Sequence, residues 1–161
     1  MMTGLRWRHS ARALLLTPDF ELLLGRHSIP GGVVWAAPGG GIEPGESPQQ
    51  ALGRELQEEV GFSLDGRGLT HVWHQEFLDS SFSGDFDGVI NDYFLLRVER
   101  FCPKGLWTPE ILLKEGLGGF AWWSADAIES STDQLFSPRN LAGLLPTITE
   151  DALTGPVLLT I

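Results

Sequence analysis

The segment from Gly40 to Phe62 constrains the fold of this chain more than any other segment. It reads GGIEPGESPQQALGRELQEEVGF, and its middle carries the signals of a helix N-terminus. Ser47 can accept a hydrogen bond from a free backbone amide as the N-cap, and Pro48 suits the first turn because it has no N–H to lose. Gln50 is placed to complete a capping box with Ser47. The pattern therefore predicts a helix that begins at Pro48.

The predicted helix ends at about Val60. Gly61 suits the C′ position that follows, because a left-handed backbone conformation costs glycine little. Gly53 lies in the middle of the helix, where glycine costs about 1 kcal/mol relative to alanine. Either close packing against a strand requires this glycine or the position is tolerant, and the sequence leaves both explanations open.

Three carboxylates of this helix, those of Glu55, Glu58 and Glu59, fall within an arc of about 100°. They repel one another, yet they adjoin an apolar stripe that must face a core, made of Leu52, Leu56 and Val60. A divalent cation would neutralise them, and hard oxygen ligands favour Mg²⁺ or Mn²⁺ over zinc. The alternative is a solvated acidic helix face. The loop Pro38–Gly41, whose backbone can approach a ligand closely, favours the metal.

The balance of charge restricts the classes of partner. The chain has 21 acidic and 11 basic residues and a formal net charge of −10. Stable nucleic-acid binding is not expected, because phosphate contacts require clustered Lys and Arg. An acidic site can still bind a small polyphosphate when metal ions lie between the two sets of negative charge. The charge therefore favours metal-chelated nucleotides over long polymers.

Length and apolar pattern predict one globular domain. At 161 residues the chain is expected to form a single domain over 1–161. No apolar run approaches the roughly 18 residues of a membrane span, and the N-terminal run is too interrupted for a secretory signal. Cys102 is the only cysteine and is expected as a half-buried strand residue, which fits a reduced, cytoplasmic setting. The sequence leaves open whether the protein forms a homodimer.

Apolar and alternating runs predict strands separated by a central helix. Strands are expected over 11–16, 21–26, 69–78, 90–100 and 120–124. The first two form a hairpin at Thr17–Asp19, and Asp79–Gly88 is expected to be a loop. Ser124 is a plausible cap of a short helix, and Pro138–Glu150 carries a weaker helical pattern. The order of these elements predicts an α/β fold, in which helices cover both faces of a mixed sheet.

The segment from Gly40 to Phe62 also resembles the Nudix box, in which Gly, five residues, Glu and seven residues precede Arg-Glu-aliphatic-x-Glu-Glu-x-Gly-aliphatic. The matching residues are Gly40, Glu46, Arg54, Glu55, Leu56, Glu58, Glu59 and Gly61. Phe62 replaces the final aliphatic residue. Beyond the box the chain resembles MutT-like members loosely. The resemblance implies a Nudix-type α/β/α sandwich and an enzyme that hydrolyses the pyrophosphate of a nucleoside diphosphate linked to another group.

The resemblance further implies a metal site and a general base. Glu58 and Glu59 are the implied ligands, with the carbonyl of Gly39 as a backbone ligand and Mg²⁺ (or Mn²⁺) as cofactor. Glu55 is either a third ligand or the base that takes a proton from the attacking water. Glu115 is another ligand or the base, and the alternative is a loop glutamate in solvent.

Four more residues have expected roles in the site. Arg54 is grouped with the catalytic residues, and its main expected role is to pair with Glu46 and fix the loop against the helix. Arg26 lies where the resemblance implies a phosphate-binding arginine, and the alternative is an arginine at a strand end. Asn140 is implied to contact the base, and the alternative is a cap or turn residue. Gly40 supplies backbone that can approach the substrate.

Other side chains have weaker assignments. Five aromatic residues are candidates to stack on a base, although each is more often a core residue: Trp7, Trp35, Trp73, Phe77 and Phe86. His71 and His74 are interpreted as strand positions and not ligands, because an oxygen-rich site does not need imidazole. Three aspartates are expected on or beside a loop near the site: Asp85, Asp87 and Asp92.

The favoured function is metal-dependent hydrolysis of a (deoxy)nucleoside triphosphate, including oxidised purine forms, by in-line attack of water. One alternative is a hydrolase of a larger conjugate, such as a dinucleoside polyphosphate, a nucleotide sugar or a capped RNA end. Another is a non-catalytic nucleotide-sensing module, which has no chemical need to keep Glu55, Glu58 and Glu59 together.

Overall fold

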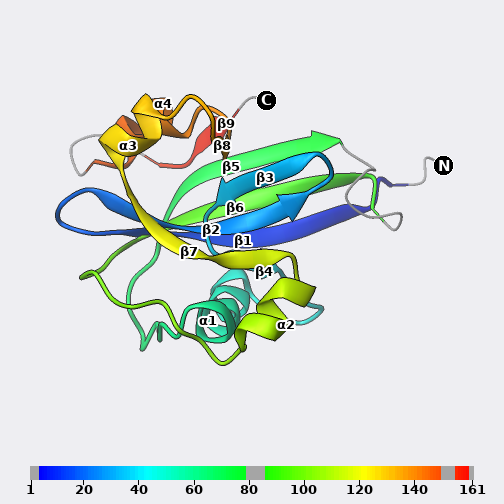
Figure 1. Cartoon of the computed structure of the whole chain (residues 1–161). Coiled ribbons are helices and arrows are strands. Elements are labelled where there is room, and N and C mark those ends of the chain that lie inside the picture. Colours follow the sequence, from blue (N-terminus) through cyan, green and yellow to red (C-terminus); the bar gives the residue numbers. More distant parts are fainter. Residues whose placement is uncertain (1–3, 79–85, 150–154, 160–161) are drawn as a thin grey trace.

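The computed structural model describes residues 4–78, 86–149 and 155–159 and contains a nine-stranded mixed sheet with helices on both faces (Figure 1). The strands are β1 (Trp7–Leu16), β2 (Glu21–Ile29), β3 (Gly32–Ala36), β4 (Gly39–Gly41), β5 (Thr70–Leu78), β6 (Gly88–Arg97), β7 (Leu117–Ser124), β8 (Leu135–Ser137) and β9 (Val157–Leu159). The helices are α1 (Pro48–Glu59), α2 (Pro109–Lys114), α3 (Ala125–Ser130), α4 (Leu141–Leu144) and the 3₁₀ helix η1 (Leu145–Ile148). The expected α/β/α sandwich with a mixed sheet is confirmed.

Strand β1 is the centre of the sheet. The strand order is β8-β3-β2-β1-β6-β5-β9, with β4 paired to β1 and β7 paired to β2. β1 runs parallel to β6 from Trp7↔Gly88 to Leu16↔Arg97, and it meets β4 antiparallel at Ala11↔Gly40. Because β4 leads directly into α1, this pairing places the start of the Gly40–Phe62 segment against the central strand.

The two faces of the sheet carry two separate hydrophobic cores. On one face, Leu14 and Leu16 of β1 pack in a cluster that includes residues of α3, α4 and η1. On the other face, Ala11 and Ala13 pack in a cluster that includes Leu52, Leu56 and Val60. Alternate residues of a strand point to opposite faces, so β1 contributes to both cores. Figure 1 shows α1 and α2 below the sheet and α3 and α4 above it.

Helix α1 begins and ends as the sequence predicts. The Ser47 hydroxyl accepts from the Gln50 N–H at 3.0 Å, and the Ser47 N–H donates to Gln50 Oε1 at 2.9 Å, which completes the capping box. Gly61 has φ +73°, the left-handed conformation expected at C′. The loop that follows β6 supplies amides to the free carbonyls of the last turn. Lys104 N–H donates to Val60 O at 3.0 Å, and Trp107 N–H donates to Glu58 O at 2.9 Å.

Some expected elements differ from the structure. The glycine-rich region that precedes α1 forms β3 and β4, because backbone pairing with β2 and β1 orders it. β6 ends at Arg97, so Cys102 lies exposed in the next loop, and its expected place in a strand was wrong. Asp92 lies within β6 and is 6% exposed, so its expected loop position was also wrong. Asp85 lies outside the described residues. In the described part of the chain, no helix has the length and apolar character to cross a membrane.

Candidate active site

The three predicted carboxylates lie where α1 packs against β4. Glu55 is 9% exposed and Glu59 is 3% exposed, whereas Glu58 is half-buried. A Cβ atom on Gly40 would lie 2.5 Å from Glu55 Oε1, so glycine is required for this close approach of strand and carboxylate. The Gly39 N–H donates to Glu59 Oε1 at 3.5 Å. The fold therefore brings the glutamates of α1 together with the backbone of β4.

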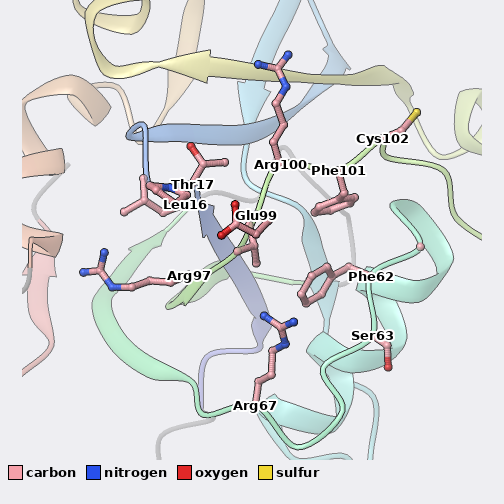
Figure 2. Close-up of a pocket in the computed structure, with 13 residues that line it drawn as sticks. Leu16, Thr17, Phe62, Ser63, Arg67, Arg97, Glu99, Arg100, Phe101 and Cys102 are labelled. Atoms are coloured by element: carbon pink, nitrogen blue, oxygen red, sulfur yellow. The ribbon is translucent and has the colours of Figure 1, made fainter.

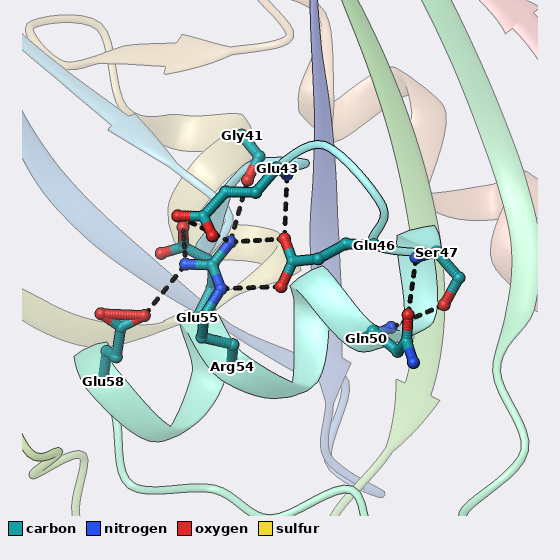
Figure 3. A network of polar contacts seen from close by, with 8 residues as sticks. All are labelled: Gly41, Glu43, Glu46, Ser47, Gln50, Arg54, Glu55 and Glu58. Atoms are coloured by element: carbon teal, nitrogen blue, oxygen red, sulfur yellow. Dashed lines mark hydrogen bonds and ion pairs between the residues drawn. The ribbon is translucent and has the colours of Figure 1, made fainter.

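Arg54 joins the loop before α1 to these carboxylates (Figure 3). Its Nε and Nη2 atoms donate to the two oxygens of Glu46, each at 2.9 Å, so the expected pair is present. Its Nη1 atom donates to Glu55 Oε1 and Glu58 Oε1, each at 3.0 Å, and Nη2 also donates to the Gly41 carbonyl at 3.1 Å. The hydrogen bond from Arg54 is the main reason why the pKa of Glu46 falls to about 2. One guanidinium thus fixes the loop, the strand and two carboxylates relative to one another.

The buried Glu59 carboxyl is electrostatically unfavourable as an anion. Burial raises its pKa to about 8, Arg12 opposes this shift, and the neighbouring Glu55 carboxylate adds to it. Arg12 itself donates from Nη1 to the carbonyls of Ala37 at 3.2 Å and Gly39 at 3.3 Å. A cation placed against the two carboxylates would stabilise their charged forms. Because the donors are carboxylate and carbonyl oxygens, the residues fit a hard divalent ion such as Mg²⁺ or Mn²⁺.

Two arginines that the sequence analysis did not single out lie beside this cluster. Arg8 and Arg12 alternate with Ser10 in the first half of β1, on the face where Leu14 lies further along. Burial and the neighbouring Arg12 lower the pKa of Arg8, and the Glu55 carboxylate partly offsets this effect. The signal was available in the sequence as alternating polar residues that precede alternating leucines on one strand.

Both arginines line a cavity of about 430 Å³. Its walls are formed by Arg8, Ser10, Arg12, His27, Ser28, Ile29, Val34, Ala36, Phe77, Val89, Asn91, Tyr93, Glu115, Leu135, Phe136, Ser137 and Arg139. The volume lies within the range of small-molecule sites, and the lining combines cationic, polar and aromatic groups. The cavity thus has the size and chemistry to hold an anionic organic molecule.

Polar atoms without partners point to the same cavity. Among the described residues, four buried side-chain atoms make no hydrogen bond, and three of them belong to cavity residues: Ser10 Oγ, His27 Nε2 and Asn91 Oδ1. Buried polar groups in folded proteins are nearly always hydrogen-bonded, so these three atoms are available to a polar ligand or to water. Burial, together with the nearby arginines, lowers the pKa of His27 to about 4. His27 is therefore neutral near pH 7 and can donate or accept without adding charge.

The remaining predicted residues divide between this cavity and other surfaces. Glu115 is exposed at the C-terminal end of α2 and lines the cavity. Arg26 is exposed on β2 and lies outside the cavity, whereas the next residue, His27, lines it. Asn140 begins α4 without a side-chain capping bond and lines a different cavity of about 260 Å³. Neither Arg26 nor Asn140 therefore shares the cavity of Arg8 and Arg12.

A family model described as the NUDIX domain matches residues 7–142. The chain belongs to the Nudix family. The matched range runs from the start of β1 into α4, so it includes the Nudix box, both arginines of β1 and the lining of the cavity.

Similar Nudix proteins differ in what their names describe. An RNA pyrophosphohydrolase of Helicobacter pylori is 30% identical over 106 residues, which are 59% of this chain and 66% of that protein. Nucleoside triphosphatase NudI of Escherichia coli is 32% identical over 89 residues, which are 55% of this chain and 60% of that protein. The chain thus spans less than two thirds of the length of these relatives. A MutT NUDIX hydrolase structure from Burkholderia pseudomallei has a TM-score of 0.65 at 20% identity, with 89% of this chain and 99% of that chain covered.

Two of the five aromatic candidates for base stacking, Trp73 and Trp35, pack in or against a hydrophobic core. Trp73 is 0% exposed and donates from Nε1 to Thr147 Oγ1 at 2.7 Å. Trp35 packs edge to face against Trp123 at 5.3 Å between centroids. Phe77 is the candidate that lines the cavity, where it is joined by Phe136, which the sequence analysis had not proposed for this role.

A larger cavity, of about 670 Å³, lies at the opposite end of β1 from Arg8 (Figure 2). It is lined by Leu16 at the end of β1, by Gly61 and Phe62 at the end of the Nudix box, and by arginines that include Arg67. Glu99 is the one carboxylate in its lining, so this cavity does not offer the clustered oxygen ligands of the α1 site. Of the Nudix-box glutamates, Glu59 lines a further cavity of about 520 Å³, together with residues 104–108 and 117–120.

Proposed function

We propose that this Nudix protein hydrolyses the pyrophosphate linkage of a (deoxy)nucleoside triphosphate, including oxidised purine forms, with Mg²⁺ or Mn²⁺. The observation that carries the proposal is the closeness of charged groups from two sites. Arg8 and Arg12 line a cavity that has unpartnered polar atoms in its wall, and they interact electrostatically with Glu55 and Glu59 of α1 respectively. A metal-chelated polyphosphate bearing a nucleoside satisfies both sites at once.

The carboxylates and the backbone of β4 would hold the metal. Glu55, Glu58 and Glu59 supply oxygens from α1, and the Gly39 carbonyl supplies one from β4. When bound, the ion neutralises phosphate oxygens and lowers the pKa of the attacking water. The contacts of Arg54 with Glu55 and Glu58 keep these side chains at a fixed geometry, which makes Arg54 a positioning residue.

Arg8 and Arg12 are proposed to bind the phosphate groups. Both guanidinium groups lie on the cavity wall that faces the carboxylate cluster, and their charge complements a triphosphate. Arg26 was implied for this role by resemblance, but its position on the exposed part of β2 favours Arg8 and Arg12 instead.

Glu115 is proposed as the general base, and Glu55 is then a ligand. Glu115 is exposed toward the cavity, whereas Glu55 is buried between α1 and Gly40 and hydrogen-bonded to Arg54. A base must reach the water that attacks the phosphorus, which an exposed side chain on the cavity rim can do.

Asn91 is the residue best placed to recognise the base. Its Nδ2 donates to Gln75 Oε1 at 3.2 Å, which leaves Oδ1 in the cavity wall without a partner. Such an acceptor complements an exocyclic amine or ring N–H of a nucleobase. Phe136 and Phe77 supply apolar surface for the ring. Asn140, the candidate from resemblance, faces another cavity.

A substrate panel with metal controls tests the proposal. Nucleoside triphosphates, a dinucleoside polyphosphate, a nucleotide sugar and a 5′-triphosphate RNA are incubated with Mg²⁺ or Mn²⁺, and phosphate and pyrophosphate release is measured. We expect a nucleoside triphosphate to have the highest kcat/KM, with loss of turnover in Glu59→Gln and after metal removal. Nucleotide binding without turnover of any substrate would refute the proposed hydrolase activity.

Matched arginine variants test the phosphate site. Arg12→Ala should raise KM for the triphosphate at least about tenfold, because a charge-assisted contact contributes on the order of 1.5–3 kcal/mol. Arg26→Ala serves as the control, since it removes the same charge from an exposed position outside the cavity. Equal effects of the two variants would contradict the assignment of Arg12. Glu115→Gln should lower kcat while leaving Mg²⁺ affinity unchanged, and the reverse result would make Glu115 a ligand.

A further inference from the structure

Three of the four histidines of the chain converge on one buried aspartate. His9 comes from β1, His71 and His74 come from β5, and Asp92 comes from β6. His9 is far in sequence from His71 and His74, and the pairing of strands brings them together. The fourth histidine, His27, lies in the cavity of the proposed substrate.

The contacts form a compact set of nitrogen and oxygen atoms. Asp92 Oδ1 lies 2.8 Å from His71 Nε2 and 2.5 Å from His74 Nδ1, and Asp92 Oδ2 lies 2.5 Å from His9 Nε2. One potential ligand atom each from His71, His74 and Asp92 all lie within 4.8 Å of one another. Ligands at about 2.0–2.1 Å from a tetrahedral ion are about 3.3 Å apart, so small side-chain rotations would admit one.

The hydrogen-bond partners of His74 favour a positive charge within the cluster. His74 faces a carboxylate at each nitrogen, with Asp92 at Nδ1 and Glu76 at Nε2, the latter at 2.7 Å. A neutral imidazole has one N–H and cannot donate to both. The hydrogen bonds to Glu76 and then to Asp92 raise the pKa of His74, so the site favours an added cation, whether a proton or a metal ion.

We propose that His71, His74 and Asp92 bind a divalent transition metal of the Zn²⁺ class, at a site separate from the Mg²⁺ site of the Nudix box. Two imidazole nitrogens and one carboxylate oxygen suit Zn²⁺, whereas the site on α1 offers oxygens only. The side chains of His71 and His74 are 34% and 28% exposed, so an ion has access and a water can complete the coordination.

Neighbouring side chains hold these ligands in place. His9 engages the second oxygen of Asp92, as an outer partner of a metal-bound carboxylate does. The His71 ring stacks on Phe94, with centroids 5.0 Å apart and an interplanar angle of 26°. Glu76 can accept from His74 Nε2 while Nδ1 binds the ion. These contacts restrict the rotation of the His71 and His74 rings.

Strand β1 lies between Asp92 of the cluster and Gly40, which approaches Glu55 of the Nudix box. Ala11 of β1 pairs with Asp92 of β6 on one side and with Gly40 of β4 on the other. Two strand spacings separate Asp92 from Gly40, or about 10 Å. The His71–His74–Asp92 site would therefore crosslink β5 to β6 beside the active site without sharing a ligand with it.

Cobalt spectroscopy in excess Mg²⁺ tests the proposal. Metal-free protein is saturated with Mg²⁺ and titrated with Co²⁺, whose visible absorption reports imidazole coordination, and Zn²⁺ is then added as competitor. We expect one Co²⁺ per chain, displaced by Zn²⁺, with affinity that falls as the pH is lowered because protons compete for the histidines. The double variant His71→Gln/His74→Gln should lose this absorption.

Two matched variants separate the new site from the other sites. His27→Gln removes the histidine outside the cluster, and Glu59→Gln removes a carboxylate of the Nudix box; both should keep the Co²⁺ spectrum. His9→Gln should weaken Co²⁺ binding by about 10- to 100-fold, as expected for an outer partner. A spectrum that is lost in Glu59→Gln, or kept in His71→Gln/His74→Gln, would overturn the proposal.

A measurement on the unaltered protein tests the proposal even if the variants fail to fold. The imidazole ¹⁵N resonances of His71 and His74 should shift on addition of Zn²⁺, whereas those of His27 should not. If the cluster holds only protons, the histidines will titrate with the same midpoints with and without Zn²⁺, and that result refutes the metal site.

Discussion

Replacement of Gly61 by alanine should destabilise the protein more than the replacement of another glycine that has the same positive φ but no close neighbour. Gly61 follows α1 with φ +73°, and a Cβ atom there would overlap the carbonyl oxygen of Lys104 and lie 3.0 Å from the carbonyl carbon. Lys104 is the residue whose N–H caps the Val60 carbonyl. Relief of the overlap therefore requires the capping loop to move away from the end of α1.

The expected loss of stability in Gly61→Ala has two contributions, and a variant of Gly66 measures one of them alone. Gly66 has the same φ, +73°, but a Cβ atom there would meet nothing within 4 Å. Gly66→Ala should therefore cost only the left-handed conformation, about 1–2 kcal/mol. Gly61→Ala should cost this and about 1–3 kcal/mol more for the displaced backbone. We expect total losses of about 1–2 kcal/mol for Gly66→Ala and about 2–5 kcal/mol for Gly61→Ala, and the reduced entropy of the unfolded chain offsets both equally.

Urea denaturation at a fixed Mg²⁺ concentration measures both variants. The unfolding midpoints of Gly61→Ala and Gly66→Ala are compared with that of the unaltered protein, and m-values confirm that the same surface is exposed. Equal losses in the two variants would refute the reasoning, because the Lys104 carbonyl would then not lie against Gly61. Activity should fall further in Gly61→Ala than in Gly66→Ala, since the displaced loop also caps Glu58 through Trp107.

Three further predictions concern α1. Gly53→Ala should raise the free energy of unfolding by about 1 kcal/mol in urea titrations, because its Cβ atom would lie 3.4 Å from Leu64 Cδ1, at contact distance; a loss of stability would contradict this. Gly40→Ala should displace the Glu55 carboxylate and lower kcat by about 100-fold with a native circular dichroism spectrum, and unchanged kcat would show that Glu55 tolerates movement. Folding raises the pKa of Glu59 from 4.5 to about 8, so its stabilising contribution in metal-free protein is present below pH 4.5 and is lost as the pH rises through 8. Glu59→Gln should remove this part of the pH dependence of the unfolding free energy, and an unaltered profile would exclude Glu59 as its source.

Local interactions explain why the Nudix helix could be predicted closely. Ser47 and Gln50 bond to each other across one turn, and Gly61 needs only its own backbone conformation. Arg54 and Glu46 are also near in sequence, and their pair was expected and is present. Strands β3 and β4 were missed because glycine-rich segments become strands only when a partner strand supplies hydrogen bonds, as β1 does for Gly39–Gly41.

The surroundings of the polar face of β1 could not be predicted from the sequence. Arg8 and Arg12 alternate with Ser10, but nothing local indicates that this face meets a cavity instead of solvent. Asn91 and His27 join it from β6 and β2, which the sheet order brings near β1. Arg26 was implied by resemblance, and nothing in the sequence indicates that its neighbour His27 lines the cavity instead.

The sequence by itself determined the Nudix family and the reaction chemistry that we propose, because the Nudix glutamates lie on one short helix whose spacing and caps are local properties. The tertiary structure decided which side chains face those glutamates and which histidines meet Asp92. Both depend on the pairing of strands from distant parts of the chain, and the free energy that selects such a pairing comes from two cores that form only when the whole sheet does.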